Sequence, residues 1–421
     1  MNIPFKLAYN TLFQVVGRAI TAVSTFAITF LIARNFTVGD YGSFTAIISY
    51  ITLFFVFSDF GFNAVFVRET GSNEAKQKEY FKNLLALRLV ISISVAFIAV
   101  TILVFTSHSS LVKIGIILGL GIIIAQSFVV SSLALFQARV RYDQSLISDV
   151  FGAISNLIFV YIAIVSFDSI LFIIIALVLG NTVRAVVAIY LAKFQIGIFA
   201  FAFNRDFWRK LVLAALPIGI ITIFSQFNAQ IDKQIILLAN YKPALGLSGE
   251  FAVGVYGLAY KIFELAVVLP TYILNVGFPV MVRKKEEGYL SLLTFTKKLS
   301  VILFLLGILS LILGLLLAPL VVNLLGGEKF SSSVLTIRVL FIGAPLFFVT
   351  PITLWLAVIL KKTKEMMFIY GFVAAFNLVA NLIFVPNFGY NAAAAITIVS
   401  EFLIFVMSSF VLLMDLRKRE L

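Results

Sequence analysis

The stretch VILFLLGILSLILGLLLAPLVV, residues 301–322, carries no charged side chain and a single hydroxyl group, that of Ser310. As an α-helix it would be about 33 Å long, because each residue adds about 1.5 Å. The hydrocarbon core of a bilayer is about 30 Å thick. The stretch therefore predicts a helix that crosses a membrane.

The whole chain has the composition of a membrane protein. Of its 421 residues, 62% are hydrophobic and only 12% are charged, whereas soluble domains are about half apolar and about a quarter charged. There is no cysteine, which excludes disulfides and thiolate metal sites. The one histidine, His108, is expected in a solvated loop. The sequence thus predicts a multi-pass membrane protein without a metal site.

Apolar runs of helical length recur along the chain and predict an all-α protein with twelve transmembrane helices. They lie near residues 10–33, 41–67, 83–106, 112–138, 147–166, 169–192, 211–239, 251–277, 299–325, 332–360, 366–385 and 391–415. The connections between them are short. None of these connections could hold a separate catalytic domain, which argues against an enzyme.

The basic residues are distributed unevenly between the two sides of the predicted membrane. Of the 32 Lys and Arg residues, 22 lie at the termini or in the loops that follow even-numbered helices. Four lie in the opposite loops: Arg34, Lys113, Lys242 and Lys329. The positive-inside rule then predicts that both termini are cytoplasmic. The net charge of +13 indicates topology and contact with anionic membrane lipids rather than a nucleic-acid partner.

The chain contains an internal repeat. VGDYG at residues 38–42 and VGVYG at 253–257 each open a predicted helix, and Arg68 and Arg283 follow at the same spacing. Repeated halves are common in transporters, where the substrate route lies between them. We therefore expect an N-lobe of helices 1–6, residues 1–200, and a C-lobe of helices 7–12, residues 201–421.

Polar residues form stripes on predicted helices 1, 2, 7 and 8, which are equivalent pairs in the two halves. A charge at a helix centre costs about 2.5–3.5 kcal/mol in a membrane, so these stripes are expected to face a hydrophilic cavity rather than lipid. Their members, helix by helix, are Gln14 and Arg18; Asp59 and Asn63; Asn228, Asp232 and Lys233; and Lys261, Glu264 and Asn275.

Two interpretations of the stripes are compatible with each other. The cations Arg18, Lys233 and Lys261 are candidates for contact with an anionic substrate head group. The same charges could also pair internally, Arg18 with Asp59, and Asp232 or Glu264 with the two lysines. We expect three further residues to be structural: Arg184 and Glu401 as contacts between helices, and Asp149 as an interfacial cap. Arg88 lies near a helix end, from which its side chain can reach the interface.

Several stretches resemble the polysaccharide-biosynthesis flippases, the O-antigen and capsule translocases. They include VVGRAITAVSTFAITFLIARNFTVGDYG (residues 15–42), QIDKQIILLAN (230–240) and VPNFGYNAAAAITI (385–398). The resemblance covers most of the chain in the same order. It implies the superfamily that also contains multidrug and toxin extrusion transporters and lipid II flippases.

The resemblance implies a fold of two six-helix lobes that form a V-shaped cavity lined by helices 1, 2, 7 and 8. It implies a non-enzymatic flippase that moves an undecaprenyl-pyrophosphate-linked oligosaccharide from the cytoplasmic to the outer leaflet of the inner membrane by alternating access. The pyrophosphate would meet Arg18, Lys233 and Lys261. No cofactor is implied, although Asp59, Asp232 and Glu264 could couple the cycle to H⁺ or Na⁺. A polysaccharide polymerase and chain-length proteins are the expected protein partners.

Other functions remain as alternatives. A cation-coupled multidrug antiporter of the same superfamily would favour an acidic cavity, whereas here the cations are at least as numerous as the carboxylates. A polysaccharide polymerase would need a sizeable outer loop with charged groups. A lipid II flippase typically has more than twelve helices. A P-loop ATPase is excluded because no GKS or GKT stretch occurs.

Overall fold

The computed structural model describes residues 3–197 and 200–420, and the side chains of residues 3–12, 15, 275, 276 and 417–420 lie outside the description. The described residues form α-helices joined by short connections, with two 3-10 turns and no strand. The predicted all-α fold is therefore confirmed.

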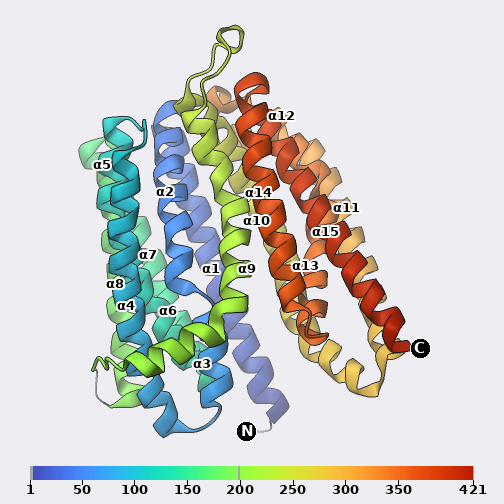
Figure 1. Ribbon diagram of the computed structural model, residues 1–421. Coiled ribbons are helices and arrows are strands. Elements are labelled where there is room, and N and C mark those ends of the chain that lie inside the picture. The colour runs from blue at the N-terminus through green and yellow to red at the C-terminus, as the bar shows by residue number, and fades with distance from the viewer. Residues whose placement is uncertain (1–2, 198–199, 421) are drawn as a thin grey trace. The chain divides into compact units, whose positions relative to one another are not determined.

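The helices follow one another closely along the chain (Figure 1). Their bounds are α1 Ile3–Asn35, α2 Val38–Asp59, α3 Phe62–Thr70, α4 Glu74–Val104, α5 Ser110–Gly119, α6 Gly121–Ala138, α7 Tyr142–Phe167, α8 Ile170–Ile196, α9 Arg205–Leu238, α10 Gly249–Glu287, α11 Tyr289–Gly326, α12 Ser333–Ile342, α13 Ala344–Ile359, α14 Thr363–Phe388 and α15 Tyr390–Glu420.

The number of membrane spans agrees with the prediction. Among the described residues, 11 stretches are long and apolar enough to cross a membrane. The pair α12 and α13, bent by 47° at Gly343, makes a twelfth when it is counted as one span. The α2–α3 pair and the α5–α6 pair likewise each form one span. The protein is a multi-pass membrane protein.

The chain packs into two compact units. Unit 1 contains Met1–Phe36 and Ala46–Gln226, and unit 2 contains Thr37–Thr45 and Phe227–Leu421. Helix α2 therefore contributes its first turns to unit 2 and the remainder to unit 1, whereas α9 contributes most of its length to unit 1 and its last turns to unit 2. These units are defined by packing, whereas the lobes expected at 1–200 and 201–421 rest on the repeat, so the lobe boundary stays a prediction.

In unit 1 an aromatic cluster holds the ends of several helices together. It contains Phe62 and Phe66 of α3, Phe81 of α4 and Phe136 of α6, all fully buried, together with Leu211 of α9. Burying a side chain of this size contributes about 1.5–3 kcal/mol. The cluster therefore fixes the short helix α3 and the first turns of α9 against the same core.

The α2–α3 break corrects one predicted helix. The sequence pattern predicted a continuous helix over 41–67, but Phe60 and Gly61 have φ values of 44° and 71° and end α2 at Asp59. A Cβ on Gly61 would lie 2.8 Å from the side chain of Ile218, and one on Gly219 would lie 2.8 Å from the ring of Phe60. Glycine suits both positions, because each backbone packs closely against a neighbouring side chain and Gly61 also has a positive φ.

In unit 2 the two copies of the repeated motif pack against each other. A Cβ on Gly42 would collide with the carbonyl oxygen of Glu250, and one on Gly254 would collide with that of Val38. Gly257 of the second copy likewise contacts Thr45. Small residues let membrane helices approach this closely. The glycines that identify the repeat are thus also the contact surface between the start of α2 and α10.

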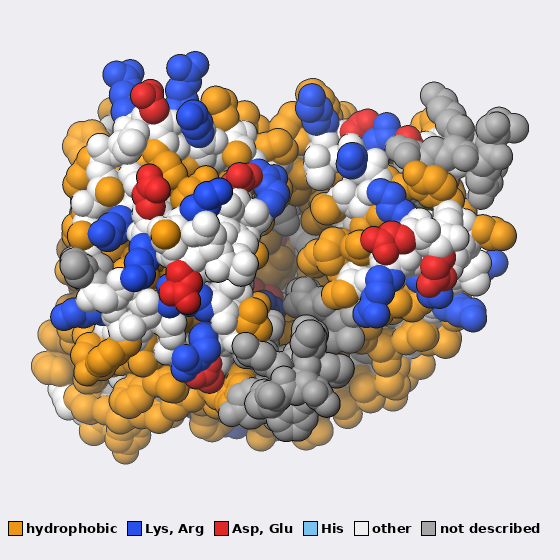
Figure 2. Space-filling view, turned by 90° about the horizontal axis from the view of Figure 1, so that it is seen from below, with side chains coloured by type: hydrophobic (Ala, Val, Ile, Leu, Met, Phe, Trp, Pro, Cys, Tyr) orange, Lys and Arg blue, Asp and Glu red, His pale blue; other side chains and the backbone are white. Residues whose placement is uncertain are grey.

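Basic residues gather at one end of each unit. In unit 1 the last turns of α3 and α8 lie at the end where α1 begins, and in unit 2 the last turn of α10 lies at the end where α15 finishes (Figure 1). The last turns of these helices carry Arg68, Lys193, Lys284 and Lys285. Figure 2, which views the molecule from below, shows numerous Lys and Arg side chains.

The expectation of a solvated His108 is wrong. The residue is only 7% exposed and packs edge-on against the ring of Tyr50 at 5.9 Å between ring centroids. Its Nδ1 lies 2.5 Å from the hydroxyl of Thr106. The side chain is therefore a packing element between α2 and the connection after α4.

Candidate functional site

Lys233 is the most unusual cation of unit 2. Its side chain is buried among apolar helices, where an uncompensated charge is costly. The ammonium donates to the carbonyl oxygen of Ala229 and to Oε1 of Gln230, both at 2.8 Å, and lies 4.0 Å from the ring centre of Tyr260. These partners are all neutral, and two of them belong to the preceding turn of α9.

Asp232, the neighbour of Lys233, points into the interior of unit 2. It has no exposed surface, and the hydroxyl of Tyr256 on α10 donates to its Oδ2. The backbone N–H of Lys233 donates to its Oδ1 at 2.8 Å. The Tyr256 hydroxyl also lies 3.4 Å from that of Thr397 on α15. The expectation that Asp232 faces water is therefore wrong, because helix periodicity does not say which neighbour covers a face.

Lys261 and Glu264 form an ion pair on the same face of α10. The two charged atoms are 2.9 Å apart, and the side chains are 33% and 45% exposed. Lys233 lies within electrostatic reach of both residues and of Asp232. The structure thus brings together four of the charged residues predicted from the stripes, and it confirms pairing of Lys261 with Glu264.

Asn228 lies one turn before Asp232 on α9. Both polar atoms of its side chain are shielded from solvent, and neither has a hydrogen-bond partner among the described residues. Leaving a buried polar group unpaired costs about 1–3 kcal/mol. Native structures keep few such groups, and each one calls for an explanation. Asn228 is therefore a candidate for contact with a bound ligand.

In unit 1 the cation Arg18 of α1 lies close to a second charge cluster. Its neighbour Gly17 packs on Asp149 of α7, and a Cβ there would lie 3.3 Å from Asp149 Oδ2. Arg184 of α8 donates to Asp149 Oδ1 at 2.6 Å, and Arg18 also acts electrostatically on this carboxylate. Two cations thus surround one carboxylate, while the Arg18 side chain stays exposed.

The expected role of Asp149 as an interfacial cap is wrong, because α7 begins at Tyr142 and Asp149 lies two turns inside it. The predicted role of Arg184 as a contact between helices is confirmed by its bonds to Asp149. The sequence offered no way to connect the two, since they are 35 residues apart on different helices.

Asp59 and Asn63 surround a cation that was expected at the interface. Arg88 of α4 is fully buried. Its guanidinium donates to Asp59 Oδ1 and to the carbonyl oxygens of Ser58 and Asp59, each at 3.3 Å, and to Asn63 Oδ1 at 2.8 Å. The break at Phe60 leaves these carbonyls without their helical donors, and Arg88 replaces the missing donors. The expectation that Arg88 reaches the interface is wrong.

The structure gives few contacts for the remaining two residues of the predicted stripes, Gln14 and Asn275. Gln14 is half-buried on α1, one turn before Arg18. Asn275 lies in α10, but its side chain is outside the described residues. In the described part of the chain, no group of three or more His, Cys, Asp or Glu residues is placed to hold a metal ion.

The described residues form an all-α membrane fold in which polar and charged side chains are buried among apolar spans. Three solved structures share it, at 14–16% sequence identity. An inward-facing multidrug resistance MATE family transporter of the MOP superfamily has a TM-score of 0.74, over 94% of this chain and 96% of that one. The lipid II flippase MurJ, in an inward closed conformation, has a TM-score of 0.76, over 97% of this chain and 89% of that one. A MOP superfamily transporter from Pyrococcus furiosus has a TM-score of 0.68, over 98% of this chain and 96% of that one.

The chain belongs to the polysaccharide biosynthesis protein family, whose model matches residues 7–285. The resemblance found in the sequence is thereby confirmed at the level of the family. A search of curated protein sequences finds no match. The solved structures establish the fold and the family assigns the chain to polysaccharide biosynthesis, and neither identifies a substrate.

Proposed function

We propose that the protein is a flippase that moves an undecaprenyl-pyrophosphate-linked oligosaccharide, such as an O-antigen or capsule repeat unit, from the cytoplasmic to the outer leaflet. The observation that carries this proposal is the ammonium of Lys233, which is buried on neutral acceptors beside Lys261 in a member of the polysaccharide biosynthesis family.

The partners of Lys233 suit a cation that exchanges ligands. The ammonium already makes both of its hydrogen bonds charge-assisted, and a charged acceptor adds a direct Coulomb attraction that a neutral carbonyl or amide lacks. A pyrophosphate oxygen would therefore compete well against the carbonyl of Ala229 and the amide of Gln230. Lys261 and the unpaired amide of Asn228 provide further donors on the same two helices. In unit 1 we propose Arg18 as a second contact for the anion, with Gln14 as a polar neighbour.

The four carboxylates differ in their suitability for ion coupling. Asp59 is held by Arg88, and Asp232 by Tyr256 and a backbone N–H. Asp149 is held by Arg184. Glu264 is 45% exposed and forms an ion pair with the flexible side chain of Lys261, so we propose Glu264 as the residue through which H⁺ or Na⁺ would act. Alternating access stays a prediction.

The membrane and the orientation are part of the same proposal. Lys and Arg at the ends of α3, α8 and α10 favour the cytoplasmic side. Both termini would then be cytoplasmic, in the inner membrane of a bacterium. A polymerase and chain-length proteins would act on the flipped product and are proposed as partners. Reporter fusions after residues 108, 242 and 421 would test the orientation: the first two should be external and the last internal.

Deletion of the gene tests the function. We expect lipid-linked oligosaccharide to remain in the cytoplasmic leaflet and surface polysaccharide to be lost, with rescue by the wild type. Lys233→Ala, Lys261→Ala and Arg18→Ala at matched expression should fail to rescue, whereas Lys242→Ala, in an exposed connection, should rescue fully. Normal surface polysaccharide together with altered sensitivity to cationic drugs would overturn the proposal in favour of a multidrug antiporter.

A further inference from the structure

Two tyrosines one turn apart on α10 contact the adjacent opposite charges of α9. The hydroxyl of Tyr256 donates to Oδ2 of Asp232, and the ring centre of Tyr260 lies 4.0 Å from the ammonium of Lys233. The centroids of the two rings are 5.7 Å apart. Both tyrosines and both charged residues are at most 9% exposed. Each charge is therefore bound by its own tyrosine inside unit 2.

Helix geometry explains why the two charges have separate partners. Consecutive residues of an α-helix point about 100° apart, so Asp232 and Lys233 face different neighbours. The Lys233 ammonium turns back along α9 to the carbonyl oxygen of Ala229 and the side chain of Gln230. The Asp232 carboxylate accepts from Tyr256 and from the backbone N–H of Lys233. The carboxylate and the ammonium are thus held by separate sets of partners.

The second tyrosine is particular to one copy of the repeat. Tyr256 of VGVYG corresponds to Tyr41 of VGDYG in the first copy. Four residues later, Tyr260 corresponds to Thr45. The copy on α10 therefore carries an aromatic ring where the other copy carries a hydroxyl, and this ring is the one that contacts the ammonium of Lys233. The ring is thus associated with the buried cation and not with the repeat itself.

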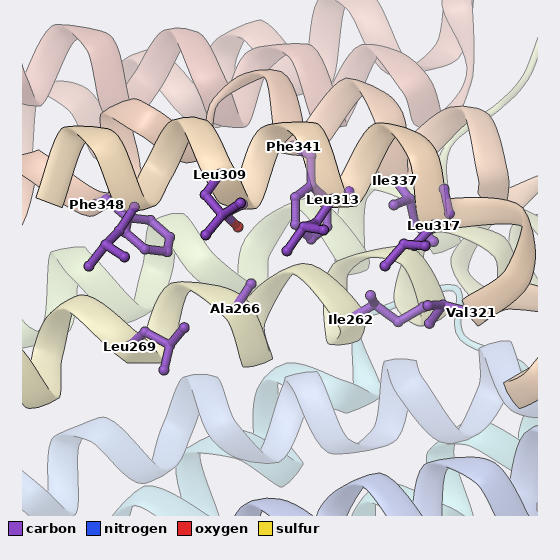
Figure 3. A pocket seen from close by; sticks show the side chains of 14 residues that line it. Ile262, Ala266, Leu269, Leu309, Leu313, Leu317, Val321, Ile337, Phe341 and Phe348 are labelled. Carbon is purple, nitrogen blue, oxygen red and sulfur yellow. The ribbon is translucent and has the colours of Figure 1, made fainter.

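A different face of α10 lines an apolar pocket. Figure 3 shows Ile262, Ala266 and Leu269 in this pocket of unit 2, which has a volume of about 320 Å³. Of the 14 residues that line it, only Ser310 has a polar side chain. The pocket offers no charged group to a pyrophosphate, so Lys233 and the polar side chains around it remain the expected site in this unit.

The Asp232 carboxylate competes with any anion that binds Lys233. A buried carboxylate attracts an ammonium and repels a phosphate strongly, because the low dielectric inside a protein screens charge weakly. A tyrosine hydroxyl that donates to the carboxylate makes a charge-assisted hydrogen bond and holds the group in place. An aromatic face attracts a cation without bringing a second negative charge. Two tyrosines can therefore keep both charges apart in one buried site.

We infer that Tyr256 and Tyr260 are positioning residues for the pyrophosphate, acting through Asp232 and Lys233. Tyr256 holds the carboxylate towards α15, where the tyrosine hydroxyl also lies 3.4 Å from that of Thr397. Tyr260 holds the ammonium with a neutral ring that a phosphate oxygen can replace. The inference rests on the proposed function and adds the residues that keep Lys233 available to its ligand.

Binding to the purified protein in nanodiscs tests the inference, with undecaprenyl pyrophosphate as the charged probe and undecaprenol as the uncharged one. Native mass spectrometry measures the Kd of each. Tyr256→Phe should weaken pyrophosphate binding about tenfold, or about 1.4 kcal/mol, because the released carboxylate competes for Lys233. The double variant Tyr256→Phe with Asp232→Asn lacks this competitor and should bind within about threefold of the wild type. Tyr260→Leu should weaken binding more than Tyr260→Phe, which keeps the ring.

Tyr50→Phe provides the matched control. Tyr50 is also buried, and its hydroxyl donates to the carbonyl oxygen of Ala99 at 2.8 Å, but it lies in unit 1. The variant loses a buried hydrogen bond without releasing a carboxylate, so its affinity for the pyrophosphate should equal that of the wild type. The affinity for undecaprenol should be the same in every variant.

Asp232→Asn alone tests the inference if Tyr256→Phe does not fold, and it should bind the pyrophosphate at least as tightly as the wild type. Equal affinity in the wild type and Tyr256→Phe, equal weakening for undecaprenol, or loss of binding in Asp232→Asn would overturn the inference. A wild type that binds both probes equally would overturn the anion-binding role of Lys233 and the inference with it. The gene-deletion phenotype tests the flippase proposal separately, so the two failures are distinguishable.

Discussion

Two buried cations, one in each unit, show how differently a membrane protein can hold a charge. Arg88 in unit 1 is bound by two carbonyls of a broken helix, a carboxylate and an amide oxygen. Lys233 in unit 2 is bound by a carbonyl and an amide of its own helix and by an aromatic face. Arg88 supplies hydrogen-bond donors to backbone carbonyls at the break in α2. The partners of Lys233 are neutral, so its ammonium can leave them without leaving a charged group unpaired. Burial alone therefore does not identify a substrate-binding charge.

The largest expected effect separates these two cations directly. Arg88→Met would leave two carbonyls and the Asn63 side-chain oxygen without this donor, and each unpaired buried polar group costs about 1–3 kcal/mol. Lys233→Met removes the ammonium near the buried Asp232 and its contact with Tyr260 but leaves the hydrogen bonds to Asp232 in place, so we expect a smaller loss, about 1–2 kcal/mol. Thermal unfolding of purified protein in nanodiscs measures both.

The same variants should rank differently in function. Lys233→Met should remain folded yet fail to support transport of the lipid-linked oligosaccharide, whereas any defect of Arg88→Met should follow the loss of folded protein. If Lys233→Met proved as destabilising as Arg88→Met, the distinction between a structural and an exchangeable cation would be wrong.

The second prediction concerns Asp232, the buried neighbour of Lys233. Tyr256→Phe removes the hydroxyl that donates to it and leaves a buried acceptor unpaired, at a cost of about 1–3 kcal/mol. Asp232→Asn should cost a similar amount. Because the two residues share one hydrogen bond, the double variant should be less destabilised than the sum, with a coupling energy of about 0.5–3 kcal/mol. Additive values from unfolding measurements would show that the bond does not stabilise the fold.

The smallest effect on stability is expected at Asn228. Asn228→Leu removes two polar atoms that lack partners, so stability should be unchanged or rise by about 1 kcal/mol, while transport falls. Asn377→Leu is the matched control, since Asn377 is buried in the same unit but donates to Ser400 at 3.0 Å. It should lose about 1–3 kcal/mol. A stability loss at Asn228 as large as at Asn377 would mean that its amide is structural.

The sequence by itself determined the spans, the basic ends and the family resemblance of this protein. Each depends on local properties: the length of an apolar run such as 301–322, the position of a lysine near a helix end, or the order of motifs along the chain. The repeat VGDYG and VGVYG was also visible, although its glycines gave no hint that the two copies pack together. Lys261 and Glu264 could be paired because they lie one turn apart on one helix.

Only the tertiary structure decided which charges meet across helices. Arg88 binds the residues at the break in α2, and Arg184 forms an ion pair with Asp149. Asp232 accepts a hydrogen bond from Tyr256. Periodicity states that residues share a face, but it does not state what covers that face. Such contacts join residues far apart in the chain, and the packing of whole helices determines them.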